Sequence, residues 1–316
     1  MRAMVIRKFG GPEVFEKQEI PTPEPGPNEV LVKVYATSIN PVDYKIRQAG
    51  SWAGVKPPAV IGYDVSGVVE ATGGAVVDFR EGDEVYYTPE IFGGGHGSYA
   101  EFHVVHESIV TRKPSNLTHE EAAGIPLAGG TAWDAIINRG LLEVGETVLI
   151  HGAGGVGSLA VQIARAAGAR VLVTCSEYME DLIKDWGALP ISYQHEDFVE
   201  VVQDETGGDG VDLVFDTVGD DTMKQSLKVI KEYGRMVNIV GTDTGLPGAN
   251  PLNLTIHYLF LQRDRAKLDS LRNLIERGQM EPVIDSVMDL SEVAEAHARL
   301  EKGGVKGKIV LRVEKQ

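Results

Sequence analysis

A glycine-rich turn near the middle of the chain decides the fold, and its sequence is Gly152-Ala153-Gly154-Gly155-Val156-Gly157. It stands between a short apolar run, 147–151, and apolar residues at helical spacing over 156–167. A second strand pattern, 170–174, follows that helix. This order suits a dinucleotide, because glycines let the backbone approach a pyrophosphate and the helix start offers unpaired N–H groups. We therefore predict cofactor contacts, rather than a tight turn without ligand, at Gly152, Gly154, Gly155, Val156 and Gly157.

The pattern around this turn predicts an α/β domain flanked by β-rich segments. Strand and helix patterns alternate from about Ala122 to about Leu254, with further strands at 211–215 and 235–240. Such alternation indicates a doubly wound parallel sheet. Before it, strand patterns stand at 30–35, 65–70 and 83–87, and after it come helical patterns at 264–277 and 291–301 and a closing strand at 308–313.

Composition and charge narrow the class of protein. The 316 residues are 43% hydrophobic and 24% charged, which is ordinary globular composition. The 30 basic and 46 acidic residues give a net charge of −16, which argues against nucleic acid as a partner. The single cysteine, Cys175, excludes an intrachain disulfide. With no stretch of roughly 20 apolar residues and no signal-peptide core, we expect a cytoplasmic protein that does not enter a membrane.

Further segments resemble a known family when they are taken together in this order. The chain is similar to the medium-chain dehydrogenase/reductase superfamily, in its zinc-free quinone oxidoreductase (zeta-crystallin-like) branch. The resemblance spans essentially the whole chain and lies in the glycine turn and in residues 38–43, 61–69, 95–101, 129–133 and 305–311. It implies a Rossmann domain, residues 123–257, inserted into a GroES-like catalytic domain made of 1–122 and 258–316. It further implies an active site in the cleft between the domains and a homodimer.

The resemblance also implies chemistry without a metal. Zinc-dependent members carry a cysteine where Asn40 stands and Gly-His-Glu where Gly62-Tyr63-Asp64 stands, and this chain has neither. Because a catalytic zinc needs about three protein ligands, we predict no metal. The expected function is zinc-independent hydride transfer from NADPH to a quinone or a related electron-poor carbonyl. The alternatives are an enone or 2-alkenal double-bond reductase, and a non-enzymatic NADPH-binding protein like some crystallins.

Three residues outside the turn resemble family positions near the nicotinamide: Asn40, Thr131 and Lys308. Each has a second interpretation. Asn40 could be a turn former before Pro41, Thr131 could be a helix N-cap, and Lys308 could be an exposed lysine at a strand edge. Val218, Ile239 and Gly241 stand at the ends of predicted strands, and we expect them to border the cofactor because ligands bind beyond the carboxyl ends of parallel strands.

The turn after the second strand bears on the choice between NADPH and NADH. Ser176 could donate to a 2′-phosphate, and Tyr193 matches a family tyrosine near the adenosine phosphate. Glu177 would repel a phosphate or could bind a ribose instead, and Met179 stands where many members have a lysine. We predict NADPH, with NAD as the alternative.

The candidates for a catalytic role are Tyr44 and Lys45. Quinone reductases of the family tend to have tyrosine aligned with Lys45, whereas enone reductases have lysine there after the same Asn-Pro-Val-Asp run. A lysine ammonium could stabilise a developing enolate, and the competing interpretation is a solvent-exposed charge. Asp43 could contact the cleft or cap a short helix over 44–48.

Overall fold

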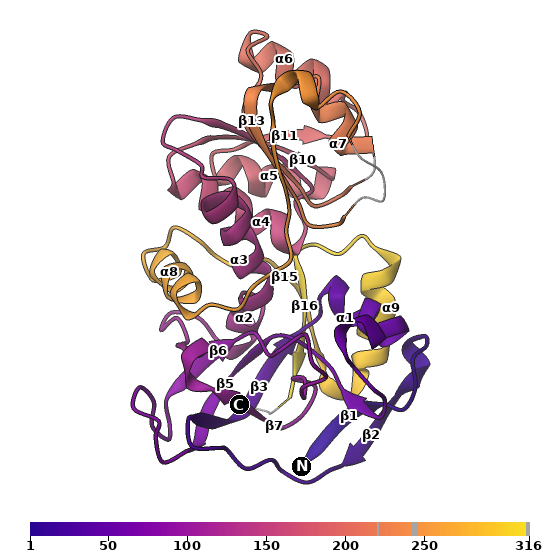
Figure 1. Cartoon of the computed structure of the whole chain (residues 1–316), viewed down its shortest axis with the longest axis vertical. Helices are drawn as coiled ribbons and strands as arrows, with labels where there is room; N and C mark the ends of the chain where they lie inside the picture. The colour runs from indigo at the N-terminus through magenta and orange to yellow at the C-terminus, as the bar shows by residue number, and fades with distance from the viewer. Residues whose placement is uncertain (220, 242–245, 314–316) are drawn as a thin grey trace. The chain divides into compact units, whose positions relative to one another are not determined.

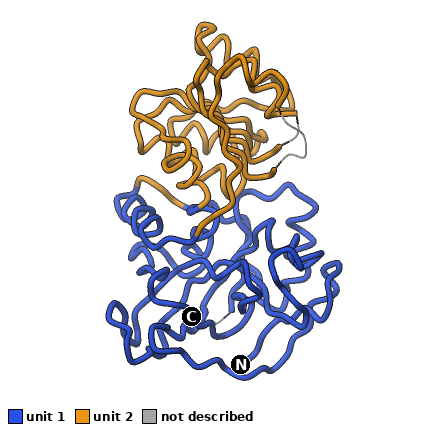
Figure 2. Tube along the Cα trace, in the orientation of Figure 1, with its two compact units in different colours: residues 1–130, 263–278, 282–316 blue, residues 131–262, 279–281 orange. Residues whose placement is uncertain are grey.

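The computed structural model describes residues 1–219, 221–241 and 246–313, which form two compact units. Unit 1 comprises residues 1–130, 263–278 and 282–316, and unit 2 comprises residues 131–262 and 279–281 (Figure 2). The expected domain division at 122/123 and 257/258 remains a prediction about folding domains, and residues 314–316 of its last segment lie outside the described residues. No helix among the described residues is both long and apolar enough to cross a bilayer.

Unit 2 contains a parallel sheet of six strands in its described part, in the order β11-β10-β9-β12-β13-β14 (Figure 1). The strands are β9 (Thr147–His151), β10 (Arg170–Cys175), β11 (Leu189–Ser192), β12 (Val211–Asp216), β13 (Ile230–Asn238) and β14 (Thr255–Tyr258). The helices between them are α4 (Gly155–Ala166), α5 (Glu177–Asp185), α6 (Phe198–Thr206) and α7 (Asp221–Ser226). The predicted doubly wound sheet is confirmed, and its order reverses at β9, directly before the glycine turn.

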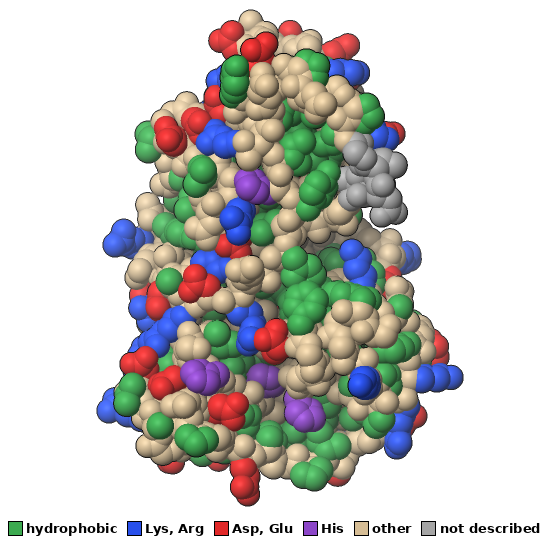
Figure 3. All heavy atoms as spheres, viewed as in Figure 1, with side chains coloured by type: hydrophobic (Ala, Val, Ile, Leu, Met, Phe, Trp, Pro, Cys, Tyr) green, Lys and Arg blue, Asp and Glu red, His purple; other side chains and the backbone are tan. Residues whose placement is uncertain are grey.

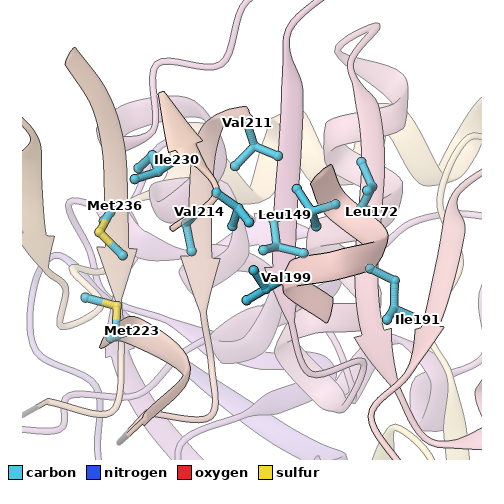
Figure 4. Packing of buried hydrophobic residues seen from close by; sticks show 11 residues of the cluster. Leu149, Leu172, Ile191, Val199, Val211, Val214, Met223, Ile230 and Met236 are labelled. Atoms are coloured by element: carbon cyan, nitrogen blue, oxygen red, sulfur yellow. The ribbon is translucent and has the colours of Figure 1, made fainter. Parts of the chain in front are cut away.

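The core of unit 2 explains why its strands appear as unbroken apolar runs. Val148, Leu149 and Ile150 are all fully buried, because helices cover a parallel sheet on both faces. On one face, Leu149 and Leu172 from neighbouring strands pack with Val199 of α6 (Figure 4). The same cluster includes Ile191, Val202, Val211, Val214, Met223, Val229, Ile230 and Met236.

Unit 1 is built on a mixed sheet in the order β15-β16-β3-β5-β6-β8, with β7 also on β3, and on a smaller sheet, β2-β1-β4. Its strands are β1 (Arg2–Ile6), β2 (Phe15–Glu19), β3 (Glu29–Ser38), β4 (Ala59–Val60), β5 (Val65–Thr72), β6 (Glu84–Tyr87), β7 (Phe102–His106), β8 (Thr111–Arg112), β15 (Ile284–Asp289) and β16 (Lys308–Arg312). The predicted closing strand is confirmed, since β16 pairs antiparallel with β3 and sets Val310 opposite Ser38.

The helices of unit 1 are α1 (Pro41–Ala49), α2 (His119–Ala123), α8 (Arg265–Glu276) and α9 (Val293–Lys302), and α3 (Pro126–Trp133) crosses the boundary between the units. On the face drawn in Figure 3, acidic and basic side chains are interspersed among hydrophobic ones. The net negative charge is therefore mixed with positive charge on that face rather than gathered into a field of one sign.

Three sequence predictions about element ends are wrong. Helix α1 begins at Pro41 instead of residue 44, because proline at the first helical position has a fixed φ and needs no N–H partner, so Asp43 lies inside the first turn. Thr131 is no N-cap, because α3 already begins at Pro126. Strand β13 covers 230–238 instead of 235–240, because Asn238 closes a turn with the amides of the next residues.

Candidate functional site

Two glycines of the central turn are required by the chain itself. Gly152 has φ +88°, a left-handed conformation that favours glycine, and a Cβ there would lie 2.6 Å from Thr217 Oγ1. At Gly157, in the first turn of α4, a Cβ would lie 1.8 Å from the carbonyl oxygen of Gly152. The helix therefore begins directly against the turn only because residue 157 has no side chain.

Gly154 has no such internal reason to be glycine. Its φ of −76° suits any residue, it is exposed, and a Cβ there would meet no described atom within 4 Å. The open space lies at the start of α4, where the amide of Ser158 is bonded back to the carbonyl of Gly154 and the three amides between them precede the helical ladder. These amides and the positive end of the helix dipole suit a diphosphate, and a bare backbone at Gly154 lets it approach. The residues therefore fit a dinucleotide.

Strands β12 and β13 end in turns of the same kind. After β12, the Asp216 side chain accepts from the amides of Val218 (2.7 Å) and Gly219 (2.9 Å). After β13, the Asn238 side chain accepts from the amides of Val240 (2.9 Å) and Gly241 (2.7 Å). Both turns therefore have fixed backbones at the carboxyl edge of the sheet. This edge carries the predicted residues Val218, which is half exposed, Ile239, which is half buried, and Gly241, which is exposed with φ +82°.

A repeated pattern in the sequence, Asx-x-Val-Gly, marks these two turns. Asp216-Thr217-Val218-Gly219 and Asn238-Ile239-Val240-Gly241 share it, one after each strand. An Asp or Asn side chain that accepts from amides two and three residues on is a common turn device, so the repeat identifies two equivalent strand ends.

At the end of β10, the hydroxyls of Ser176 and Tyr193 lie 3.1 Å apart and both side chains reach solvent. Met179, by contrast, is buried in α5. Cys175 is buried as well, and burial raises the pKa of its thiol to about 11. His151 is wholly buried and contacts Thr174 Oγ1 (3.3 Å) and Ser226 Oγ (2.8 Å), so it belongs to the interior of unit 2.

In unit 1, one buried carboxylate gathers the second group of predicted residues. Asp64 accepts from Ser38 Oγ (2.5 Å), Asn40 Nδ2 (2.6 Å) and the amide of Leu127 (2.8 Å), the second residue of α3. Lys308 Nζ lies 3.5 Å from the same carboxylate. Asp64 was named from the sequence only by comparison with zinc enzymes, because its partners come from three segments that are distant from it in sequence.

Lys308 is buried, so its interpretation as an exposed strand-edge lysine is wrong. Its Nζ donates to the carbonyl of Ile39 (3.0 Å) and to Asn40 Oδ1. Both ends of the Asn40 amide are thus engaged, Oδ1 by Lys308 and Nδ2 by Asp64. Burial lowers the pKa of Lys308 and raises that of Asp64, and the attraction between them opposes both shifts.

A second buried acid adjoins Asn40. Asp43 Oδ2 accepts from the backbone N–H of Asn40 (2.7 Å) and from the Tyr99 hydroxyl (2.9 Å). The same hydroxyl contacts His297 Nε2 (3.0 Å). Asp43 Oδ1 is buried, and the described residues offer it no hydrogen-bond partner. Burial, the largest cause, raises the pKa of Asp43 to about 7.

The proposed catalytic pair lies on α1, after these residues. Tyr44 is half buried, and burial raises the pKa of its hydroxyl, with a smaller contribution from Glu301. Lys45 is exposed and forms no ion pair with any described residue. Thr131 is buried within α3.

The described residues contain no group of three or more His, Cys, Asp or Glu side chains placed to hold a metal ion. Where zinc-dependent relatives carry ligands, Asn40 and Asp64 instead meet the ammonium of Lys308. The absence of a metal remains a prediction.

The chain matches known families over most of its length. Residues 26–115 match the alcohol dehydrogenase GroES-like domain, and residues 187–311 match a family described as zinc-binding dehydrogenase. It is 36% identical to the Arabidopsis thaliana chloroplastic NADPH-dependent alkenal/one oxidoreductase, over 98% of this chain and 79% of that protein. It is 32% identical to human quinone oxidoreductase, over 98% of this chain and 97% of that protein.

Solved structures are also similar to this chain over nearly its whole length. A crystal structure of an NAD-dependent alcohol dehydrogenase has a TM-score of 0.93 at 34% identity and covers 99% of this chain and 100% of that one. The Escherichia coli quinone oxidoreductase complexed with NADPH has a TM-score of 0.88 at 29% identity, with 99% of this chain and 100% of that one covered. The chain belongs to the medium-chain dehydrogenase/reductase superfamily, in its quinone oxidoreductase branch, and has that family's GroES-like and Rossmann parts.

Substitution of Gly154 should affect cofactor binding, whereas substitution of Gly157 should affect stability. Gly154→Asp should fold normally yet bind NADPH at least about a hundredfold more weakly, since it sets an anion where the diphosphate would lie. Gly157→Ala should instead lower the free energy of unfolding by about 1–3 kcal/mol, because its Cβ overlaps backbone. Fluorescence titration and urea denaturation separate these effects. Gly74→Asp, at another glycine with open space, is the control.

An unchanged NADPH dissociation constant in Gly154→Asp would contradict the assignment of the turn. Destabilisation of Gly154→Asp as large as that of Gly157→Ala would contradict the distinction between the two glycines.

The raised pKa of Asp43 predicts that the free energy of unfolding depends on pH. Its folded pKa of about 7 lies above the ordinary 3.8, so the native state holds the proton more tightly than the unfolded state. The Asp43 contribution should therefore become less favourable as pH rises from about 4 to about 7, by at most about 1.4 kcal/mol per pH unit. Urea denaturation should show wild type losing stability relative to Asp43→Asn across this window. A difference between the two proteins that does not change with pH would refute the prediction.

Proposed function

We propose that the chain is a zinc-independent, NADPH-dependent reductase that delivers hydride to a quinone or a related electron-poor carbonyl acceptor. The observation that carries this proposal is the open backbone at Gly154 in front of the free amides of α4. Gly152, Gly155, Val156 and Gly157 would complete the contacts with the diphosphate. NADPH binding by the Escherichia coli relative supports the choice of cofactor, and the NAD-dependent relative keeps NAD as the alternative.

The remaining cofactor contacts are proposed from position. Ser176 follows β10, the neighbour of β9, and Tyr193 follows β11; the adenosine ribose binds at this edge in such sheets. Val218, Ile239 and Gly241 would border the cofactor along the same edge. Asn40, Thr131 and Lys308 are assigned to the nicotinamide side by family resemblance. In this role Lys308 would act through Asn40, because its own ammonium is engaged inside unit 1.

When bound, NADPH supplies the hydride. The chain's own contribution is to orient the two planar reactants and to stabilise the oxygen on which negative charge develops. Lys45 presents an exposed ammonium and Tyr44 presents a half-buried neutral hydroxyl, so either can donate to that oxygen. The proton that completes the reduction then comes from solvent through one of these groups.

A double bond conjugated to a carbonyl is the second candidate acceptor. Lys45 after Asn40-Pro41-Val42-Asp43 favours it, because a fixed positive charge stabilises an enolate. The Arabidopsis thaliana relative, whose name specifies alkenals and enones, supports the same candidate. A cytoplasmic homodimer without metal completes the proposal, and an NADPH-binding protein without turnover is the non-enzymatic alternative.

Lys45→Ala should lower kcat for enone reduction by about tenfold or more while the NADPH dissociation constant stays within about twofold, since the ammonium acts on the acceptor oxygen. Lys8→Ala, at an exposed lysine in an earlier segment, is the matched control. Equal turnover of Lys45→Ala and wild type would remove this lysine from the mechanism.

A side-by-side assay of NADPH oxidation with a benzoquinone and a short enone tests the acceptor class. We expect turnover of at least one of them that survives dialysis against a chelator, as a zinc-independent enzyme requires. Tight NADPH binding without turnover of either would establish the non-enzymatic alternative. Stoichiometric zinc found by elemental analysis, with activity lost on its removal, would refute the metal-free proposal.

A further inference from the structure

Two pairs of polar side chains meet beyond the ends of β10 and β11. Ser176 Oγ lies 3.1 Å from the hydroxyl of Tyr193. Glu177 follows Ser176 directly, and His195 stands two residues after Tyr193. The Glu177 Oε1 atom lies 2.6 Å from His195 Nε2. The Glu177 and His195 side chains are 64% and 63% exposed, so a ligand can reach both.

The backbone holds these side chains at one place. Strands β10 and β11 are parallel neighbours with Cys175 opposite Ser192, and the amide of Tyr193 is bonded to the carbonyl of Cys175. The turn that follows is closed by the His195 and Glu196 amides, which both donate to the carbonyl of Ser192. The Glu196 carboxylate accepts in return from the Ser192 amide (2.7 Å). His195 is therefore presented by a closed turn rather than by a free loop.

This position decides between the two forms of a dinucleotide in doubly wound sheets. The residue after the second strand either accepts from the ribose 2′-hydroxyl or makes room for a cation that binds a 2′-phosphate. Glu177 alone would repel a phosphate, and the lysine of α5, Lys184, pairs instead with Glu180 at 3.4 Å. His195, when it is protonated, can bring a positive charge to Glu177, because its Nε2 lies 2.6 Å from Glu177 Oε1.

We propose that His195 is the cation that recognises the 2′-phosphate of NADPH. In its protonated form, Nε2–H donates to Glu177, which offsets the carboxylate charge and orients the ring. Nδ1–H then donates to the phosphate together with the hydroxyls of Ser176 and Tyr193. The inference rests on the proposed function, which supplies the dinucleotide, but it concerns only the preference for the phosphorylated form.

The sequence gives no local signal for this role. His195 lies in the turn after β11, whereas Ser176 and Glu177 follow β10, and only the parallel pairing of β10 with β11 brings the three together. The turn after β10 itself, Ser176-Glu177-Tyr178-Met179, contains no basic residue that would indicate this role.

Parallel fluorescence titrations with NADPH and NADH test the proposal on wild type, His195→Ala and His195→Lys. His195→Ala should weaken NADPH binding about tenfold or more and leave NADH binding unchanged, because it removes a charge-assisted hydrogen bond to a group that NADH lacks. His195→Lys should keep the preference for NADPH. His106→Ala, at an exposed histidine of unit 1, is the control.

Equal binding of NADPH by wild type and His195→Ala would overturn this inference and leave the proposed function standing. Equal weakening of NADPH and NADH in His195→Ala would also overturn it, because a structural role has no preference for the phosphate. A wild-type protein that binds neither dinucleotide would overturn the proposed function itself.

Discussion

The approach of helix α4 to the carbonyl of Gly152 is the constraint on which the cofactor site depends. A side chain at Gly157 would overlap that oxygen, so the absence of one lets the helix start against the turn. The amides of the first helical turn then face the space left by Gly154, at the strand where the sheet order reverses. Steric exclusion thus fixes the backbone, and the backbone in turn supplies the electrostatics for a diphosphate.

The second organising feature is the buried carboxylate of Asp64. It joins the end of β3, the Asn40 side chain, the start of α3 and Lys308 of the last strand. Burying a carboxylate and an ammonium is costly, and only close pairing with further hydrogen bonds offsets that cost. The cluster therefore couples strand β16 to the start of helix α1, which carries the proposed catalytic residues Tyr44 and Lys45. Loss of one partner would leave the other charge buried and unpaired.

The sequence predicted the parallel sheet well, because strands buried on both faces leave apolar runs such as Val148-Leu149-Ile150. It predicted the glycine turn because close backbone approach demands glycine at fixed spacing. It misplaced the start of α1, since the helix was expected over 44–48, whereas the proline at residue 41 in fact opens it. It also misplaced Thr131, since two glycines suggested a helix start inside a helix that begins at Pro126.

What sequence could not predict is contact between distant segments. The burial of Lys308 depends on Asp64 and Asn40, and the placement of His195 beside Glu177 depends on the pairing of two strands. Neither relation has a fixed spacing along the chain. The roles of the proposed site residues follow from family position and from local geometry, and they remain proposals.

Amide hydrogen exchange with and without NADPH tests the central claim most directly. If the first turn of α4 binds the diphosphate, NADPH should slow the exchange of the Gly155, Val156 and Gly157 amides. The effect should be larger than in the first turn of α6, which begins at Phe198. Slowed exchange elsewhere with no change at these three amides would contradict the account, because the cofactor would then bind without the glycine turn.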